Sequence, residues 1–195
     1  MMKINSLALF FGLSLLFSCQ NKKSQSSLQD LIQEFEGKSG KQEYLASPYV
    51  TAGDRVYMVG HQDGTFPDLG FHVEGEMGGI WNHPIKLMDG FTVAIGLEGN
   101  SYCLDKADEF VNYPVANKHI FREQVPGLEV ERFQFIPDRT EGLILEFSLK
   151  NVDNSAKTFG FEFAGHTDLM PVWLGERAGM VDHEDILDFD EERQA

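Results

Sequence analysis

The carboxylates between Asp63 and Phe91 are the first residues whose types and spacing could do chemistry. Glu74 and Glu76 flank Gly75, and three aspartates lie nearby in the sequence: Asp63, Asp68 and Asp89. Two carboxylates on either side of a glycosidic bond can act as acid and base, and their separation sets the stereochemical outcome. Short-range acidic pairs are also frequent by chance in an acidic chain, where they cap turns and accept backbone hydrogen bonds. We favour this second role and predict no catalytic residue among them.

Aromatic and amide groups in the same segment point to sugar binding. A flat indole ring can stack on the apolar face of a pyranose, while amide and imidazole groups hydrogen-bond its hydroxyls. The predicted substrate-binding residues are therefore Trp81, Asn82, His83, Glu76 and Trp173. For either Trp taken alone, packing in the core is the more frequent role.

Metal and nucleophile motifs are missing from the sequence. His61-x-Asp63, His72-x-Glu74 and His166-x-Asp168 each put two polar side chains on one side of a strand, but none has a second pair at zinc spacing. There is no G-x-S-x-G motif, and Cys103 has no neighbouring base in the sequence. We therefore predict no metal and no cofactor, and we expect Cys103 to be a buried small hydrophobe outside any disulfide.

The elements that must position these residues read as strands. Residues 63–91 show no helical or strand period, and their aromatic content favours an ordered loop over disorder. Around this loop, side chains alternate between apolar and polar with a period of two in five runs: 54–60, 91–97, 129–136, 143–150 and 159–163. We predict an all-β, antiparallel β-sandwich for residues 41–195, incomplete at its C-terminal end. The turn formers from Asn151 to Ser155 predict a hairpin between the last two runs.

A short helix is predicted before the sandwich. Leu28, Leu31, Ile32 and Phe35 have the spacing of one helix face. Ser27 with Asp30 resembles a capping box, and Gly37 can end the helix. We expect this face to pack on the sandwich, the alternative being a frayed spacer.

The first residues have the pattern of an export signal. Residues 1–18 combine Lys3 with an apolar core too short to span a bilayer. The sequence before Cys19 resembles the lipobox of bacterial lipoproteins, in which that Cys is acylated; an ordinary signal peptide is the alternative. Residues 19–40 then comprise the lipidated Cys, a polar tether and the short helix. Gln20 in place of Asp favours, by the same resemblance, the periplasmic side of the outer membrane.

The chain has a formal net charge of −15, which restricts its partners. Such a charge argues against nucleic acid and against an anionic membrane surface as ligands, whereas a neutral sugar remains allowed. The stretch 182–195 is strongly acidic, and we interpret it as a solvated tail or linker.

Four segments resemble one known family. They are YVTAGDRVYMVGHQDGTFPDLGFHVEGEMGGIWNHPIKLMDGF, FVNYPVANKHIF, LEVERFQFIPD and FEFAGHTDLMPVWLGERAGM. Together they look like the start of glycogen-debranching-type glycoside hydrolases of Bacteroidetes, which are similar to the processing α-glucosidases and belong to the six-hairpin glycosidases. The resemblance covers about residues 44–182. It implies an N-terminal β-supersandwich followed by an α/α toroid that holds the acid and base of an inverting hydrolase.

The resemblance sets the functional expectation. We expect the N-terminal sandwich of a lipid-anchored hydrolase of α-glucans, without the toroid in this sequence and inactive alone, so no catalytic residue is carried over to a position here. The implied partners are an α-glucan or oligosaccharide, the toroid, and the membrane through the lipid anchor. A stand-alone carbohydrate-binding lipoprotein is the main alternative, and a structural protein whose acidic tail meets a basic partner is a third.

Overall fold

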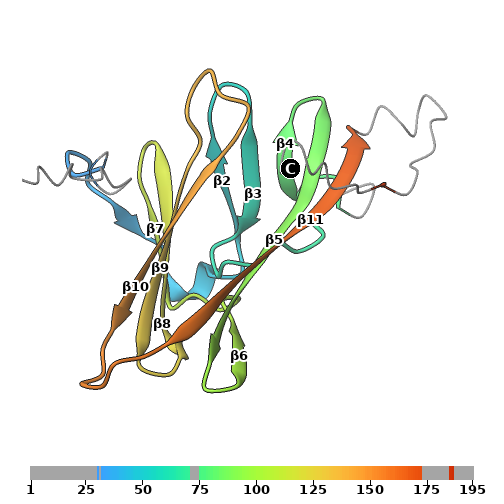
Figure 1. Ribbon diagram of the computed structural model, residues 1–195. Helices are drawn as coiled ribbons and strands as arrows, with labels where there is room; N and C mark the ends of the chain where they lie inside the picture. Colours follow the sequence, from blue (N-terminus) through green and yellow to red (C-terminus); the bar gives the residue numbers. More distant parts are fainter. Residues whose placement is uncertain (1–29, 31, 71–74, 173–184, 187–195) are drawn as a thin grey trace, which may run out of the picture.

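The computed structural model describes residues 30, 32–70, 75–172 and 185–186, and it consists of two antiparallel β-sheets packed face to face (Figure 1). Sheet A has the strand order β1 (Lys38–Ser39), β7 (Glu109–Asn112), β8 (Ala116–Val125), β9 (Leu128–Phe135) and β10 (Ile144–Asn151). Sheet B has the order β11 (Phe159–Pro171), β5 (Ile85–Leu97), β4 (Gly79–Asn82), β3 (Tyr57–His61) and β2 (Pro48–Ala52). A further strand, β6 (Asn100–Cys103), also pairs with β5. The predicted all-β sandwich is confirmed.

Period-two alternation forms the core as predicted. On β5, the inward side chains Phe91, Val93 and Ile95 are buried, while Thr92 between them is exposed. On β9, Val130 lies in the main core, whereas Phe133 points to the other face of sheet A. Inward apolar rows of this kind are what hold the two sheets together, since buried apolar area stabilises by roughly 25 cal/mol per Å².

Only Asp30 and residues 32–36 of the predicted N-terminal helix belong to the described part of the chain. Asp30 is helical and a turn follows, closed by a 2.9 Å hydrogen bond from the Phe35 amide to the Ile32 carbonyl. Ile32 is buried against Ala116 and Phe133 on the outer face of sheet A, whereas Phe35 of the same predicted face is 42% exposed, so the prediction that this face packs on the sandwich holds for Ile32 alone. The other residues of the predicted helical face before Ile32 lie outside the described residues.

The predicted hairpin between residues 143–150 and 159–163 is wrong. Strand β10 pairs with β9, while β11 pairs with β5, so the two strands belong to different sheets. The turn-rich segment between them carries the chain across from sheet A to sheet B (Figure 1). The apolar faces of β10 and β11 then meet across the sandwich, where the rings of Phe147 and Phe161 are 5.0 Å apart. Turn chemistry alone does not distinguish such a crossing from a hairpin.

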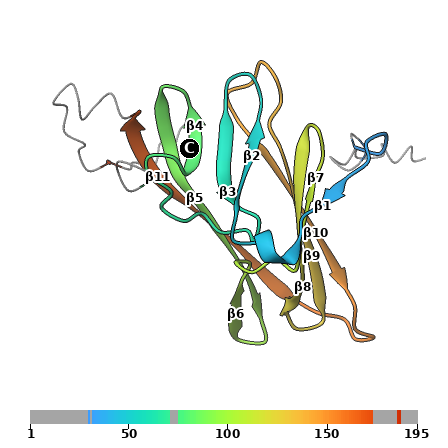
Figure 2. The ribbon, with the colours of Figure 1, turned by 180° about the vertical axis from the view of Figure 1, so that it is seen from behind.

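The opposite side of the sandwich is closed by short elements. Seen from behind, the 3-10 helix η1 (Gln42–Tyr44) lies beside the edge strands β1 and β2 (Figure 2). The Gly40 amide donates a 2.7 Å hydrogen bond to the Phe110 carbonyl, and the Gln42 side chain bonds the Asp108 carbonyl at 2.5 Å. The β10 and β11 edges lie at the other ends of the two sheets.

Candidate functional site

The loop between β3 and β4 folds over the outer face of sheet B. Trp81 lies beside Tyr57 across the β3–β4 pair, and its ring is parallel to the Tyr57 ring at 6.2 Å. The Trp81 Nε1 donates a 2.8 Å hydrogen bond to the carbonyl of Gly78 in the loop. This cover leaves only 1% of Trp81 exposed. Part of the aperiodic segment 63–91 therefore covers the outer face of sheet B.

Lys86 is buried beside Trp81 and is held by two carboxylates. Its Nζ forms ion pairs with Asp89 and, at 2.7 Å, with Asp168 of β11, and it donates a 3.0 Å hydrogen bond to the Gly75 carbonyl. Burial alone would lower the pKa of Lys86, but the hydrogen bonds to Asp168 and Asp89 outweigh it and raise this pKa above its ordinary value. Lys86 therefore stays charged and joins β5, β11 and the loop.

A groove opens along β5 next to this ion cluster. Strands β4 and β6 pair with the two ends of β5, so the stretch from Asp89 to Val93 has neither strand beside it. A hollow of about 480 Å³ occupies this gap. Polar side chains and an aromatic floor line it: Thr65, Asp89, Thr92, Asp105, His166, Phe66 and Phe91. We call this hollow the β5 groove.

The floor of the β5 groove depends on a glycine. Gly90 has a φ of +147°, and a Cβ at this position would collide with the Phe66 ring. Phe66 can therefore pack closely against the backbone of β5 at Gly90 and contact Phe91, with the two ring centroids 4.8 Å apart. Only a residue without a side chain permits this approach.

A polar cluster inside the sandwich anchors the wall of the β5 groove. Arg132 of β9, 1% exposed, donates a 3.1 Å hydrogen bond from Nη1 to the Gly64 carbonyl, and its guanidinium lies 5.1 Å from the centre of the Phe91 ring. The His119 Nε2 lies 3.3 Å from the His61 carbonyl. Side chains of sheet A thus contact the start of the β3–β4 loop from inside the sandwich. These contacts fix the backbone that carries Thr65 and Phe66.

His119 makes stability depend on pH. Burial, followed by the nearby Arg132 cation, holds the pKa of His119 well below its usual 6.5. The unfolded chain then binds the additional proton first, so the stability linked to this group is present above pH 6.5 and falls as the pH drops toward the folded pKa. We expect a loss of up to about 1.4 kcal/mol per pH unit below 6.5 from this residue. The free energy of unfolding, measured by urea denaturation between pH 7.5 and 5, should fall less steeply with decreasing pH in His119→Phe than in the wild type. An equal dependence on pH in the two proteins would contradict the assignment.

The structure places the described residues that were predicted to bind sugar outside the β5 groove. Trp81 is buried between the outer face of sheet B and the β3–β4 loop, so its ring offers no surface for stacking. Asn82 is half-buried at the end of β4, and His83 is exposed in the following turn, which contains a cis peptide to Pro84. Glu76 is half-buried in the loop. None of these residues lines the β5 groove. Trp173 and Cys19 lie outside the described residues.

Cys103 is also placed differently from the prediction. It is a free, exposed thiol on the wall of the β5 groove, not a buried hydrophobe. It lies opposite Ala94 on the outer face of sheet B, where the sheet faces solvent. Its neighbours Tyr102 and Leu104 point to the other face, with Leu104 buried in the core.

Sequence reasoning missed Asp89, Asp105 and His166 as a group. Asp89 and His166 come together because β5 pairs with β11, and Thr92 Oγ1 lies 3.2 Å from His166 Nε2. Asp105 follows β6, which folds back along β5. The signal in the sequence is His166-x-Asp168, whose spacing does not indicate that Asp89 or Asp105 lies nearby.

The described residues contain no group of three or more His, Cys, Asp or Glu side chains that could hold a metal ion. Among these residues there is also no helix long and apolar enough to cross a membrane. No family model, curated protein or solved structure matches the chain.

Proposed function

We propose that this chain is the β-sandwich domain of a lipid-anchored glycoside hydrolase acting on α-glucans, and that the β5 groove binds the glucan. The observation that carries the proposal is the composition of the groove, in which two carboxylates, an imidazole and two hydroxyls surround an aromatic floor. The four sequence segments that resemble glycogen-debranching-type hydrolases support the choice of α-glucan.

The chemistry of the β5 groove suits a neutral polyol. Carboxylates such as Asp89 and Asp105 accept hydrogen bonds from sugar hydroxyls, and Thr65 and Thr92 can both donate and accept. The half-buried Phe66 ring offers an apolar surface to the C–H face of a pyranose. A volume of about 480 Å³ lies within the range of small-molecule sites.

The role proposed for the sandwich is binding and support. By the resemblance, the acid and base belong to an α/α toroid that packs on the sandwich, so we assign no catalytic residue to the numbered positions here. The Lys86 ion cluster would keep Asp89 in place at the groove wall, since Lys86 holds one of its carboxylate oxygens. The proposed anchor is the acylated Cys19, on the periplasmic side of the outer membrane.

Sugar binding tests the proposal directly. Calorimetric titration of the chain with maltotetraose should give saturable binding, and His166→Ala and Asp105→Ala should each lower the affinity about fivefold, because each removes a hydrogen bond of about 1 kcal/mol. Asn154→Ala, an exposed residue in the turn between β10 and β11, is the matched control and should bind as the wild type does. Binding that is unchanged in both groove variants would refute the assignment of the β5 groove.

A stand-alone carbohydrate-binding lipoprotein is the second candidate. It rests on the same polar and aromatic lining of the β5 groove. Both candidates predict binding, but only the first predicts that an added α/α toroid restores hydrolysis of glycogen. Hydrolysis by the chain alone that is abolished by Glu76→Gln would contradict both.

A further inference from the structure

The edges of β10 and β11 lie on the same side of the sandwich. Strand β10 ends sheet A and β11 ends sheet B, so each has a neighbour on one side only in the strand orders of the described residues. The two strands run alongside each other on this side, where the Phe147 ring of β10 lies 5.0 Å from the Phe161 ring of β11 (Figure 1). Long strand edges of this kind present backbone N–H and C=O groups that can pair with another chain.

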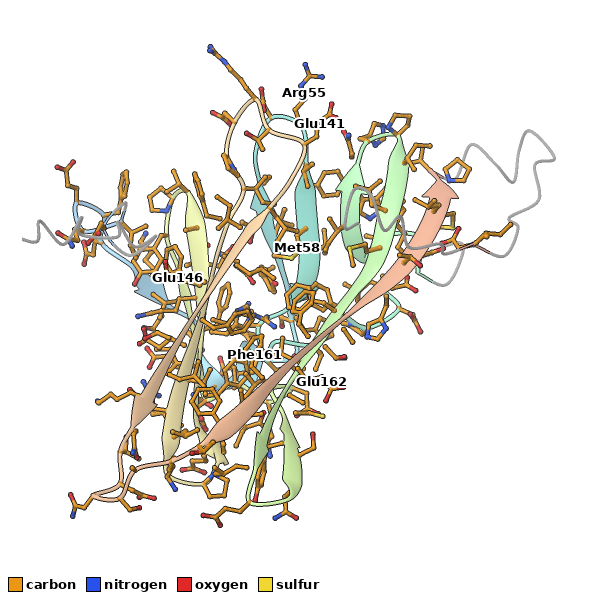
Figure 3. The ribbon with its side chains drawn as sticks, in the orientation of Figure 1. Arg55, Met58, Glu141, Glu146, Phe161 and Glu162 are labelled. Carbon is orange, nitrogen blue, oxygen red and sulfur yellow. The ribbon has the colours of Figure 1, made fainter. Side chains whose placement is uncertain are left out.

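The side chains along this edge are apolar. Phe159, Phe161 and Phe163 of β11 are 41–48% exposed. Behind them, between the two strands, lies an apolar hollow of about 430 Å³ whose walls include Leu145 and Phe147. The acidic side chains Glu146 and Glu162 lie on the sides of their strands that face away from this hollow (Figure 3). No charged residue lines the hollow.

We propose that this edge is the interface with a second copy of the chain, formed by antiparallel pairing of β11 with its symmetry mate. A two-fold axis perpendicular to sheet B makes the two β11 strands antiparallel without further adjustment. With the axis at Phe161, this residue faces its own copy, and Phe159 faces Phe163 of the second copy. The row of three phenylalanines at a spacing of two residues is therefore self-complementary.

The apolar area available is that of a weak dimer. A phenylalanine side chain buries about 150–250 Å², so the exposed parts of Phe159, Phe161 and Phe163 provide roughly 200–350 Å² in each copy. In two copies these rings provide roughly 400–700 Å², and the walls of the hollow add to it, so the apolar area is that of a weak, transient interface. We therefore expect a dissociation constant on the order of 10 μM.

Sedimentation velocity over a concentration series tests the dimer. The chain should change from monomer to dimer across the range of about 1 to 100 μM. Phe161→Asp should keep the chain monomeric at the highest concentration while its circular dichroism spectrum remains that of the folded sandwich, although the lost contact with Phe147 lowers the melting temperature. A dimer that forms equally well with Phe161→Asp would refute the interface.

Disulfide trapping tests the register. Directly opposed residues of an antiparallel pair have Cβ atoms about 4.5–5.5 Å apart, close to the geometry of a disulfide. Oxidised Phe161→Cys should form a covalent dimer through position 161, whereas Thr140→Cys, an exposed control away from β11, should not. Mass spectrometry of the bridged peptides separates this product from bridges through Cys19 or Cys103. A monomeric chain with no bridge at position 161 would contradict the proposal and assign the edge to a different polypeptide.

Discussion

Replacing both Asp89 and Asp168 with asparagine is expected to lower the free energy of unfolding by about 3 kcal/mol, because it leaves a buried charge without a partner. Lys86 is 1% exposed, and among the described residues these two carboxylates are its ion-pair partners. The Gly75 carbonyl alone cannot neutralise an ammonium group. Urea denaturation at pH 7 measures the loss.

Adding Lys86→Met to the double variant provides the control. Since methionine carries no charge, the triple variant should regain most of the lost stability, which a merely steric effect of the asparagines would not allow. The raised pKa of Lys86 also predicts how stability depends on pH. The stability of the wild type that is linked to this group is present below pH 10.5 and is lost as the pH rises through the folded pKa. A double variant as stable as the wild type would show that the cluster contributes nothing.

Trp81→Ala is expected to lower the free energy of unfolding by about 4 kcal/mol, because it empties a large buried site and removes the contact with Tyr57. For a chain of this size, the melting temperature should fall by roughly 10 °C. Thermal unfolding followed by circular dichroism measures both changes.

Trp81→Phe separates packing from hydrogen bonding. This variant retains an aromatic ring beside Tyr57 but loses the bond from Nε1 to Gly78, so it should cost about 1 kcal/mol beyond the smaller ring volume. Maltotetraose affinity should be unchanged, since Trp81 does not line the β5 groove. A Trp81 variant that loses affinity for maltotetraose but keeps its melting temperature would show that Trp81 contacts the sugar.

The strands were predictable because burial imposes a local pattern. The row from Phe91 to Leu97 alternates in sequence and lies with one face in the core. Which strand pairs with which was not predictable, because β5 takes β11 as its neighbour from far along the chain. The turn formers after Asn151 suit a crossing between sheets as well as they suit a hairpin.

The candidate site was less predictable than the fold. The β5 groove gathers Asp89, Asp105 and His166 through strand pairing, and no spacing in the sequence brings them together. Trp81 was proposed from its type, which suits the core and a sugar platform equally well. The cover provided by the loop decides between the two roles, and this is a tertiary property. The burial of Arg132 was not predictable from the sequence either, since a charged residue on a strand is expected to face solvent.

Protection of Cys103 from alkylation tests the central claim most directly, because this exposed thiol lies on the wall of the β5 groove. The rate of its reaction with iodoacetamide is measured by site-resolved mass spectrometry as maltotetraose is added. The account predicts a saturable slowing at Cys103 that weakens in parallel with binding in His166→Ala. An alkylation rate that stays constant while calorimetry reports binding would place the sugar elsewhere and contradict the account.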